Sequence, residues 1–270
     1  MTTVSVDGTG LADAVPEAMV LRVRRDLTGA IRTTVVNVPA RAGAWRFPEA
    51  PGPKKLTIDL HLLADSFAVR RAACNALALW LTPSIAEEVQ IIVDDEPDRF
   101  YLGMFDDDRA PDEWLIAAEI SLVFNVDPYR HATTLSTVTV TATGSPDSDT
   151  FTVPDDLSAD PIIEITPTNG TLATLELTFN GDSVEWSGPD VLASGETLTI
   201  SSLSDTVSLG ENVDVNLTGA FDPGAAEQGI ASVSVSGFPS ILPGSNAWAL
   251  SWTGTATSVD ITFTWRERFI

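Results

Sequence analysis

Two groups of consecutive acidic side chains are the residues of this chain with the most evident potential for chemistry. Residues 94–98 read Asp-Asp-Glu-Pro-Asp, and residues 106–108 are three aspartates. Carboxylates gathered around one hairpin can share a Ca²⁺, and a suitable pair can hydrolyse a glycosidic bond. Neither group has the spacing of a dedicated calcium loop, and no carboxylate pair stands out by position. We therefore expect no metal site and no catalytic residue, and interpret both groups as solvated turns.

Nucleophiles and nitrogen or sulfur ligands are scarce. The chain has two histidines, His61 and His131, and a single cysteine, Cys74, which is too few for a disulfide or a metal cluster. There is no HExxH, GxSxG or P-loop motif, and the Gly-Thr-Gly at residues 8–10, in what reads as a loose N-terminus, lacks the third glycine of a dinucleotide site. We interpret the histidines as structural or exposed and Cys74 as a packing residue of a helix. No cofactor is expected, and the chain is not expected to be an enzyme.

Tryptophans are a third group with possible function. Trp248 and Trp252 lie four residues apart in a strand-like segment and therefore share one face, and Trp186 precedes them. Exposed rings in this arrangement can stack on a sugar, so Trp248 and Trp252 are candidate glycan contacts. The alternative is that all three are core residues, which is the commoner role of aromatic side chains in a β-sandwich.

The elements that must position these residues fall into two parts with different charge. From His131 to Trp265 the sequence contains no Lys or Arg, although the whole chain has 15 basic and 38 acidic residues. Residues 1–131 hold 13 basic and 20 acidic groups, a net charge of −7, and residues 132–270 hold 2 and 18, a net charge of −16. Such a break predicts two domains, 1–131 and 132–270. The net charge of −23 argues against nucleic-acid binding and against anionic membranes.

The first domain reads as mostly β with one helix. Residues 56–62 alternate apolar and polar side chains, and residues 67–81 have helical spacing. Asp65 or Ser66 should cap this helix and Pro83 should stop it. The other expected strands are 18–24, 31–38, 89–93, 99–105 and 118–124, with a loop over 39–53. The expected buried stripe of the helix is Val69, Ala73, Leu77, Trp80 and Leu81, with Arg70, Arg71 and Asn75 facing outward.

The second domain reads as short strands separated by turns, which predicts a β-sandwich or barrel. The expected strands are 137–143, 162–166, 172–179, 197–201, 213–217, 231–236, 247–252 and 259–265. No segment at the N-terminus resembles a secretory signal, and no apolar run approaches the roughly 18 residues of a membrane helix. The whole chain is therefore predicted to be mainly β and to be made in the cytoplasm.

The order of these elements resembles a known family, the distal tail protein (Dit) family of long-tailed, siphovirus-type phages, also called siphovirus tail component. In the first domain the resemblance lies in KLTIDL at 55–60, ALWLTP at 78–83, IVDDEPDRFY at 92–101 and FNVDPY at 124–129. In the second it lies in PIIEI at 161–165, SGETLTI at 194–200, GFP at 237–239, LPGSN at 242–246 and the final WRERF at 265–269. The loop at 39–53 and the lack of basic residues in the second domain are not part of it.

The resemblance implies a β-rich belt domain that forms a ring of six, followed by a galectin-like sandwich. It implies a structural virion protein of the tail tip that joins the tail tube to the tail hub, fibre or spike of the baseplate and lets DNA pass during ejection. It implies no catalysis. Two alternatives stay open: a carbohydrate-binding receptor module that uses Trp248 or Trp252, and a glycosidase. The sequence does not say which host is infected or whether the particle is an infectious virus.

Overall fold

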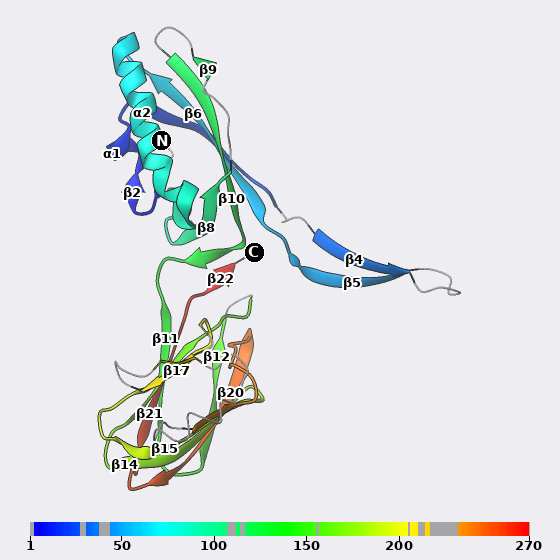
Figure 1. The fold of residues 1–270 in the computed structure, drawn as a ribbon, viewed down its shortest axis with the longest axis vertical. Helices are drawn as coiled ribbons and strands as arrows, with labels where there is room; N and C mark the ends of the chain where they lie inside the picture. Colours follow the sequence, from blue (N-terminus) through cyan, green and yellow to red (C-terminus); the bar gives the residue numbers. More distant parts are fainter. Residues whose placement is uncertain are drawn as a thin grey trace. The chain divides into compact units, whose positions relative to one another are not determined.

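The chain is β-rich, as predicted, and divides into two compact units, Met1–Thr133 and Thr134–Phe269 (Figure 1). The computed structural model describes residues 3–27, 31–37, 44–106, 112–113, 117–154, 157–204, 206–209, 214–216 and 232–269. Each unit has its own buried apolar cluster. The domain boundary after residue 131 was predicted from a change in composition. The two units are instead defined by the contacts within each of them.

The first unit is built on one antiparallel sheet in the order β2-β1-β7-β8-β10-β6-β3, with β9 also pairing with β10. Its edges are therefore β2 on one side and β3 on the other. The strands are β1 (Val4–Val6), β2 (Thr9–Gly10), β3 (Ala18–Arg25), β6 (Lys54–Leu63), β7 (Val89–Val93), β8 (Arg99–Phe105), β9 (Asp112–Glu113) and β10 (Ala117–Ala132).

One face of this sheet forms the core. The predicted alternation in β6 is confirmed, because Leu56, Ile58, Leu60 and Leu62 are all buried. In the neighbouring strand β10, side chains in register with them, such as Leu122 opposite Ile58, are buried as well. A period of two places alternate side chains on one face, so this face is apolar along its length.

Helix α2 (Phe67–Ala86) covers the core face, as Figure 1 shows. Of the two predicted caps, Ser66 is the one used, since its hydroxyl accepts a hydrogen bond from the Val69 N–H. The prediction that Pro83 ends the helix is wrong. Pro83 lies inside the last turn, where it removes only one backbone bond, and the buried Ser84 donates its hydroxyl to the Leu81 carbonyl.

The buried stripe of α2 differs from the prediction at its first turn. Ala73, Leu77, Trp80 and Leu81 are buried as expected, but Val69 is 38% exposed. Arg70, expected to face outward, is 3% exposed and has its guanidinium carbon 4.9 Å from the centre of the Phe67 ring. Position 70 continues the spacing of 73, 77 and 81 back by one turn, and its long apolar stem can be buried with the stripe.

Two further sequence interpretations are corrected in this unit. Residues 44–51, assigned to a loop, form β5 (Ala44–Pro51), which pairs with β4 (Ile31–Asn37) in a two-stranded ribbon. The N-terminus, read as loose, forms β1, β2 and the short helix α1 (Leu11–Ala14), and its Val4, Val6 and Leu11 are buried. Apolar side chains at these positions are drawn into the same core as α2.

The second unit is a sandwich of two antiparallel sheets, in the orders β11-β21-β13-β16-β17-β18 and β12-β20-β14-β15-β19. Of these strands, β12, β15 and β17 were not predicted, although turn signals flank them. The strands are β11 (Ser136–Ala142), β12 (Asp147–Val153), β13 (Ile162–Pro167), β14 (Thr171–Phe179), β15 (Asp182–Ala193), β16 (Leu198–Ser201), β17 (Thr206–Leu209), β18 (Asp214–Asn216), β19 (Ser232–Val235), β20 (Gly244–Gly254) and β21 (Val259–Trp265). The last strand, β22 (Arg268–Phe269), belongs to neither sandwich sheet.

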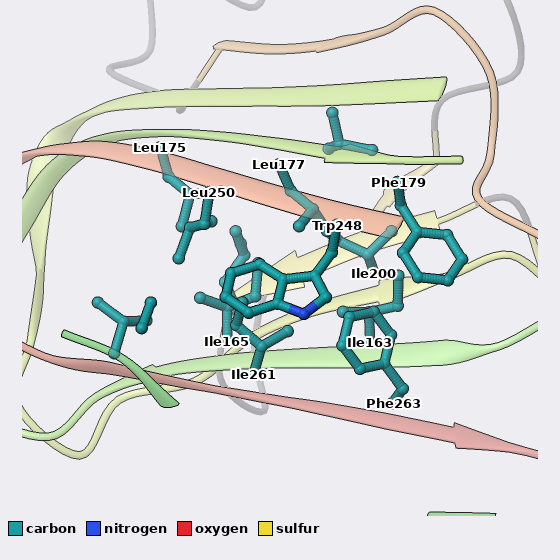
Figure 2. Packing of buried hydrophobic residues seen from close by; sticks show 14 of the residues in the cluster. Ile163, Ile165, Leu175, Leu177, Phe179, Ile200, Trp248, Leu250, Ile261 and Phe263 are labelled. Atoms are coloured by element: carbon teal, nitrogen blue, oxygen red, sulfur yellow. The ribbon is translucent and has the colours of Figure 1, made fainter. Parts of the chain in front are cut away.

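The inner faces of the two sheets meet in an apolar core. Figure 2 shows Leu175, Leu177 and Leu250 of one sheet across from Ile165 and Ile261 of the other. Phe179 and Phe263 also meet across this core, with ring centres 5.0 Å apart. Packing of alternate apolar side chains from both sheets is what stabilises a sandwich. The galectin-like character of this sandwich stays a prediction.

Candidate functional site

The acidic turn at residues 94–98 is largely exposed, as expected of a solvated turn, since only Glu96 of its five residues is partly buried. It joins β7 to β8, and two of its carboxylates are paired: Asp95 with the Arg25 guanidinium and Glu96 with the Arg130 guanidinium. The second acidic group continues only to Asp106 within the described residues, and its residues 107 and 108 lie outside them. Among the residues that the structure describes, no three His, Cys, Asp or Glu side chains gather in a way that could hold a metal ion.

Arg25 connects the acidic turn to a partly buried tyrosine. Its Nε donates to the Tyr101 hydroxyl at 3.0 Å, and its Nη2 donates to Asp95. Burial opposes the charge of Arg25, but the hydrogen bonds that Arg25 donates to Asp95 and Tyr101, together with the charge interactions with both, outweigh it and raise the pKa of the guanidinium above its ordinary value. For Tyr101 the effect of burial has the opposite sign, and it raises the pKa of the hydroxyl. Tyr101 is therefore neutral at any physiological pH and acts as a packing and hydrogen-bonding residue.

The histidines and the cysteine lie apart from one another. His61 is half-buried in β6, and the His131 ring stacks on Phe100 with centres 5.3 Å apart. The His131 Nε2 lies 3.5 Å from an Asp127 carboxylate oxygen. Cys74 is partly buried and packs against the first core. No helix in the described part of the chain combines the length and the apolar character that a membrane crossing requires.

The candidate glycan contacts are inside the sandwich. Trp248 is 4% exposed, Trp252 is 7% exposed, and Trp186 is also buried. Figure 2 shows the Trp248 ring lying between the two sheets, and the Trp252 indole donates to the Ala256 carbonyl at 3.0 Å. The shared face predicted from their spacing is thus the inner face. A glycan contact at Trp248 or Trp252 stays a prediction, and their burial leaves little of either ring for a sugar.

A charged cluster that sequence reasoning missed lies on the open face of the first sheet. Asp59 of β6 accepts hydrogen bonds from Arg22 at 3.0 Å, Arg24 at 2.9 Å and the Ser121 hydroxyl at 2.7 Å. Burial opposes ionisation of Asp59, but these three donors outweigh it and lower the pKa of the carboxyl below its ordinary 3.8. The signal was present in the sequence, because Arg22 and Arg24 have the same strand parity.

A groove lies between α2 and the N-terminal strands. It has a volume of about 350 Å³ and is mostly apolar. The Trp80 indole donates to the Thr9 carbonyl at 2.9 Å and so fixes one wall, while Leu79 stands at its side with 74% of its surface exposed. Its lining residues are Val6, Asp7, Thr9, Ala14, Ala76, Leu79, Trp80 and Pro83. Sequence reasoning missed it because Leu79 lies just off the buried stripe of the helix.

Taken together, the described residues offer polar pairs that hold strands together, an edge strand and an apolar groove. No family model matches the sequence, and a comparison with curated proteins finds no significant match.

Solved structures do show similarity. The crystal structure of the SPP1 Dit protein, described as a paradigm of the hub adsorption apparatus in phages that infect Gram-positive bacteria, matches with a TM-score of 0.73 and 18% identity, covering 100% of both chains. Two structures of the phage P2 baseplate in its activated conformation, with Ca and with Sr, match with TM-scores of 0.45 and 0.44 at 8% and 7% identity, covering 99% of this chain and 98% of theirs. The chain thus has the fold of a Dit protein over its whole length, which confirms the predicted resemblance for the fold.

Proposed function

We propose that this chain is a structural protein of a phage or phage-like tail tip. It would form a ring that joins the tail tube to the tail hub, with its fibre or spike. The observation that carries this proposal is the likeness to the SPP1 Dit protein across both units, at a TM-score of 0.73 with complete coverage of both chains. A match over both units says more about function than a match to a β-sandwich alone would, since β-sandwiches serve many functions.

The charge of the chain supports a ring that DNA passes through. Each copy carries −23, so a ring of six would present a strongly negative body. A negative lumen repels phosphates and lets a DNA molecule slide without binding. The composition also places most of the negative charge in residues 132–270, so the lumen receives only part of it.

The location of the chain in the particle tests this proposal. Gold-labelled antibodies against the full chain should bind particles at the end of the tail that is distal to the head. Labelling of the capsid, of the whole tail length or of no particle at all would contradict the assignment. Antibodies against a capsid protein of the same particle provide the control for accessibility and orientation.

Receptor binding by the sandwich is a separate function of the same tail tip. It rests on the expectation that Trp248 or Trp252 contacts a glycan. A glycan array with the full chain tests it, and turnover of a bound glycan would instead indicate a glycosidase. Trp252→Phe keeps an aromatic ring in the core, so loss of binding in this variant, with an unchanged melting temperature, would assign the contact.

A further inference from the structure

The first unit carries two different surfaces at the two edges of its sheet. At one edge, β3 pairs with β6 and has no second partner strand in the described part of the chain. At the other edge lie β1 and β2, with the apolar groove between them and α2. A closed ring of identical subunits needs two unlike, complementary surfaces on each copy. The sheet edges are therefore the first place to search for them.

The edge at β3 exposes apolar side chains. Leu21 is 51% exposed and Met19 is 37% exposed. The register between β3 and β6 shifts between Val20 and Arg22, so Leu21 sits at an irregularity that gives it no direct partner on β6. Such bulges re-aim a side chain at the edge of a sheet. An open strand edge with exposed apolar side chains tends to associate with another chain, so a monomeric protein usually avoids it.

The groove at the opposite edge has matching apolar character. Leu79 is 74% exposed beside it, and Val6, Ala14 and Trp80 supply further apolar lining. The hydrogen bond from the Asp7 N–H to the Gln90 carbonyl holds the turn after β1 against β7. The groove is thus a preformed surface, because its walls are bonded to the sheet and to the helix.

The two edges also differ in charge. The described residues of β3 and of the start of β6, 18–26 and 54–59, contain five basic and two acidic residues, a charge of +3 in a chain of −23. Residues 3–17 and 72–93, which include β1, β2, α1, most of α2 and β7, contain no Lys or Arg. Asp7, Asp13, Glu87 and Glu88 are exposed there. Opposite charges on two surfaces orient an encounter and fix its register more than they add affinity.

We propose that the β3 edge of one copy docks on the groove edge of a second copy, with Leu21 packing beside Leu79 of its neighbour. This inference rests on the proposed ring and names the surfaces that would build it. Repeating the same contact head to tail closes a ring when the rotation permits. The occupant of the groove is thus a second copy of this chain, and the contact uses apolar packing at the centre with charges around it.

Disulfide trapping tests the contact in the full chain. Leu21→Cys and Leu79→Cys are made separately in a Cys74→Ala background, mixed and oxidised. The mixture should give a covalent dimer on a non-reducing gel, because only neighbouring residues can reach disulfide geometry. A chain with both substitutions should give a ladder of linked copies. The control pair is Leu79→Cys with Leu203→Cys, whose parent Leu203 on the second unit is 72% exposed.

The outcomes separate this inference from the proposed function. A yield on the order of tenfold above the control pair would support the contact, since random collisions link both pairs equally. A yield equal to the control overturns it. If the unmodified chain still forms rings in that case, only the choice of surfaces is wrong. If linked dimers form but the unmodified chain never forms rings, the contact stands and the ring does not.

A second experiment asks whether the contact is head to tail. Leu21→Glu spoils the β3 edge and leaves the groove intact, whereas Leu79→Glu does the reverse. Each variant alone should be monomeric by light scattering, and an equal mixture should form one-to-one dimers through the one intact pair of surfaces. A mixture that stays monomeric, or a single variant that still assembles, would contradict the proposal.

Discussion

The two units hold their strands together on the outside with different side chains. In the first, Arg22 and Arg24 of β3 donate to Asp59 of β6. In the second, uncharged hydroxyl pairs such as Thr174 with Thr253, at 2.7 Å, bridge neighbouring strands. Salt and acid weaken an ion pair, whereas a hydroxyl pair has no charge to screen or titrate. The sandwich therefore needs no Lys or Arg between residues 131 and 265 to join its strands.

The largest loss of stability is expected from a substitution inside the sandwich. Such a loss would show that packing in the core stabilises this unit. Trp248→Ala removes a ring that is 4% exposed and leaves a cavity between the sheets. We expect the free energy of unfolding to fall by about 3–5 kcal/mol, as for other buried large-to-small changes. Urea unfolding followed by fluorescence and circular dichroism measures it. A loss below roughly 1 kcal/mol would mean that the ring is not part of the core.

The next effect is expected at a buried polar residue of the sandwich, Asn246, which is 0% exposed. Its Oδ1 accepts from the Leu242 N–H and from the Asn180 side chain, each at 2.8 Å, and its Nδ2 donates to the Leu242 carbonyl at 2.8 Å. Asn246→Ala leaves these groups unpaired and should cost about 2–3 kcal/mol. Asn75→Ala, on the exposed side of α2, is the control and should leave urea unfolding unchanged.

The ion cluster of the first unit should give a smaller effect that depends on pH. The folded-state pKa of Asp59 is lowered, so its stabilisation is present above the ordinary pKa of 3.8 and is lost as the pH falls through the folded value. Asp59→Asn should lower the free energy of unfolding by about 1 kcal/mol at pH 7, because Arg22 and Arg24 are largely exposed.

Comparing unfolding of the variant and the parent at pH 7 and below pH 3.8, in low and in high salt, checks this prediction. The difference between them should shrink in acid and in salt. A difference that is the same at both pH values would show that the carboxylate charge of Asp59 does not stabilise the sheet.

The smallest effect is expected on the outer face of the sandwich. Thr139 and Thr262 pair through their hydroxyls at 3.1 Å across β11 and β21. Thr139→Val keeps the shape and the β-propensity of the residue, so unfolding should change by less than about 0.5 kcal/mol. The change should also be the same in low and high salt. A salt-dependent change would break the contrast between the two units.

Much of the fold followed from side-chain periodicity. The alternation of Leu56, Ile58, Leu60 and Leu62 predicted a strand and its buried face correctly. Alternate side chains of a strand point to one face of the sheet, so an apolar residue at every second position places that face on a core. The helical spacing around Leu77 predicted α2 for the same reason. Composition gave a wrong prediction for residues 44–51, because strand pairing, and not the local sequence, makes them a strand. Residues 48 and 51 are prolines, yet β5 accommodates both because β4 is its single pairing strand among the residues that the structure describes.

The candidate site was less accessible to sequence reasoning. The spacing of Trp248 and Trp252 placed them on one face but did not say which face, since that depends on the opposing sheet. The pairing of Asp59 with Arg22 joins residues that are 37 positions apart, so the register between β3 and β6 creates it. The groove beside Leu79 likewise forms only when the N-terminal strands pack near α2.

The native mass of the purified full chain, measured by light scattering in low and high salt and accompanied by negative-stain images, tests the central claim most directly. Our account predicts rings of six with a mass six times the 28.7 kDa of one chain. Salt should favour them, because it screens the mutual repulsion of copies that carry −23 each. A particle of different symmetry, or a monomer in both salts even when the neighbouring tail proteins are present, would contradict the account.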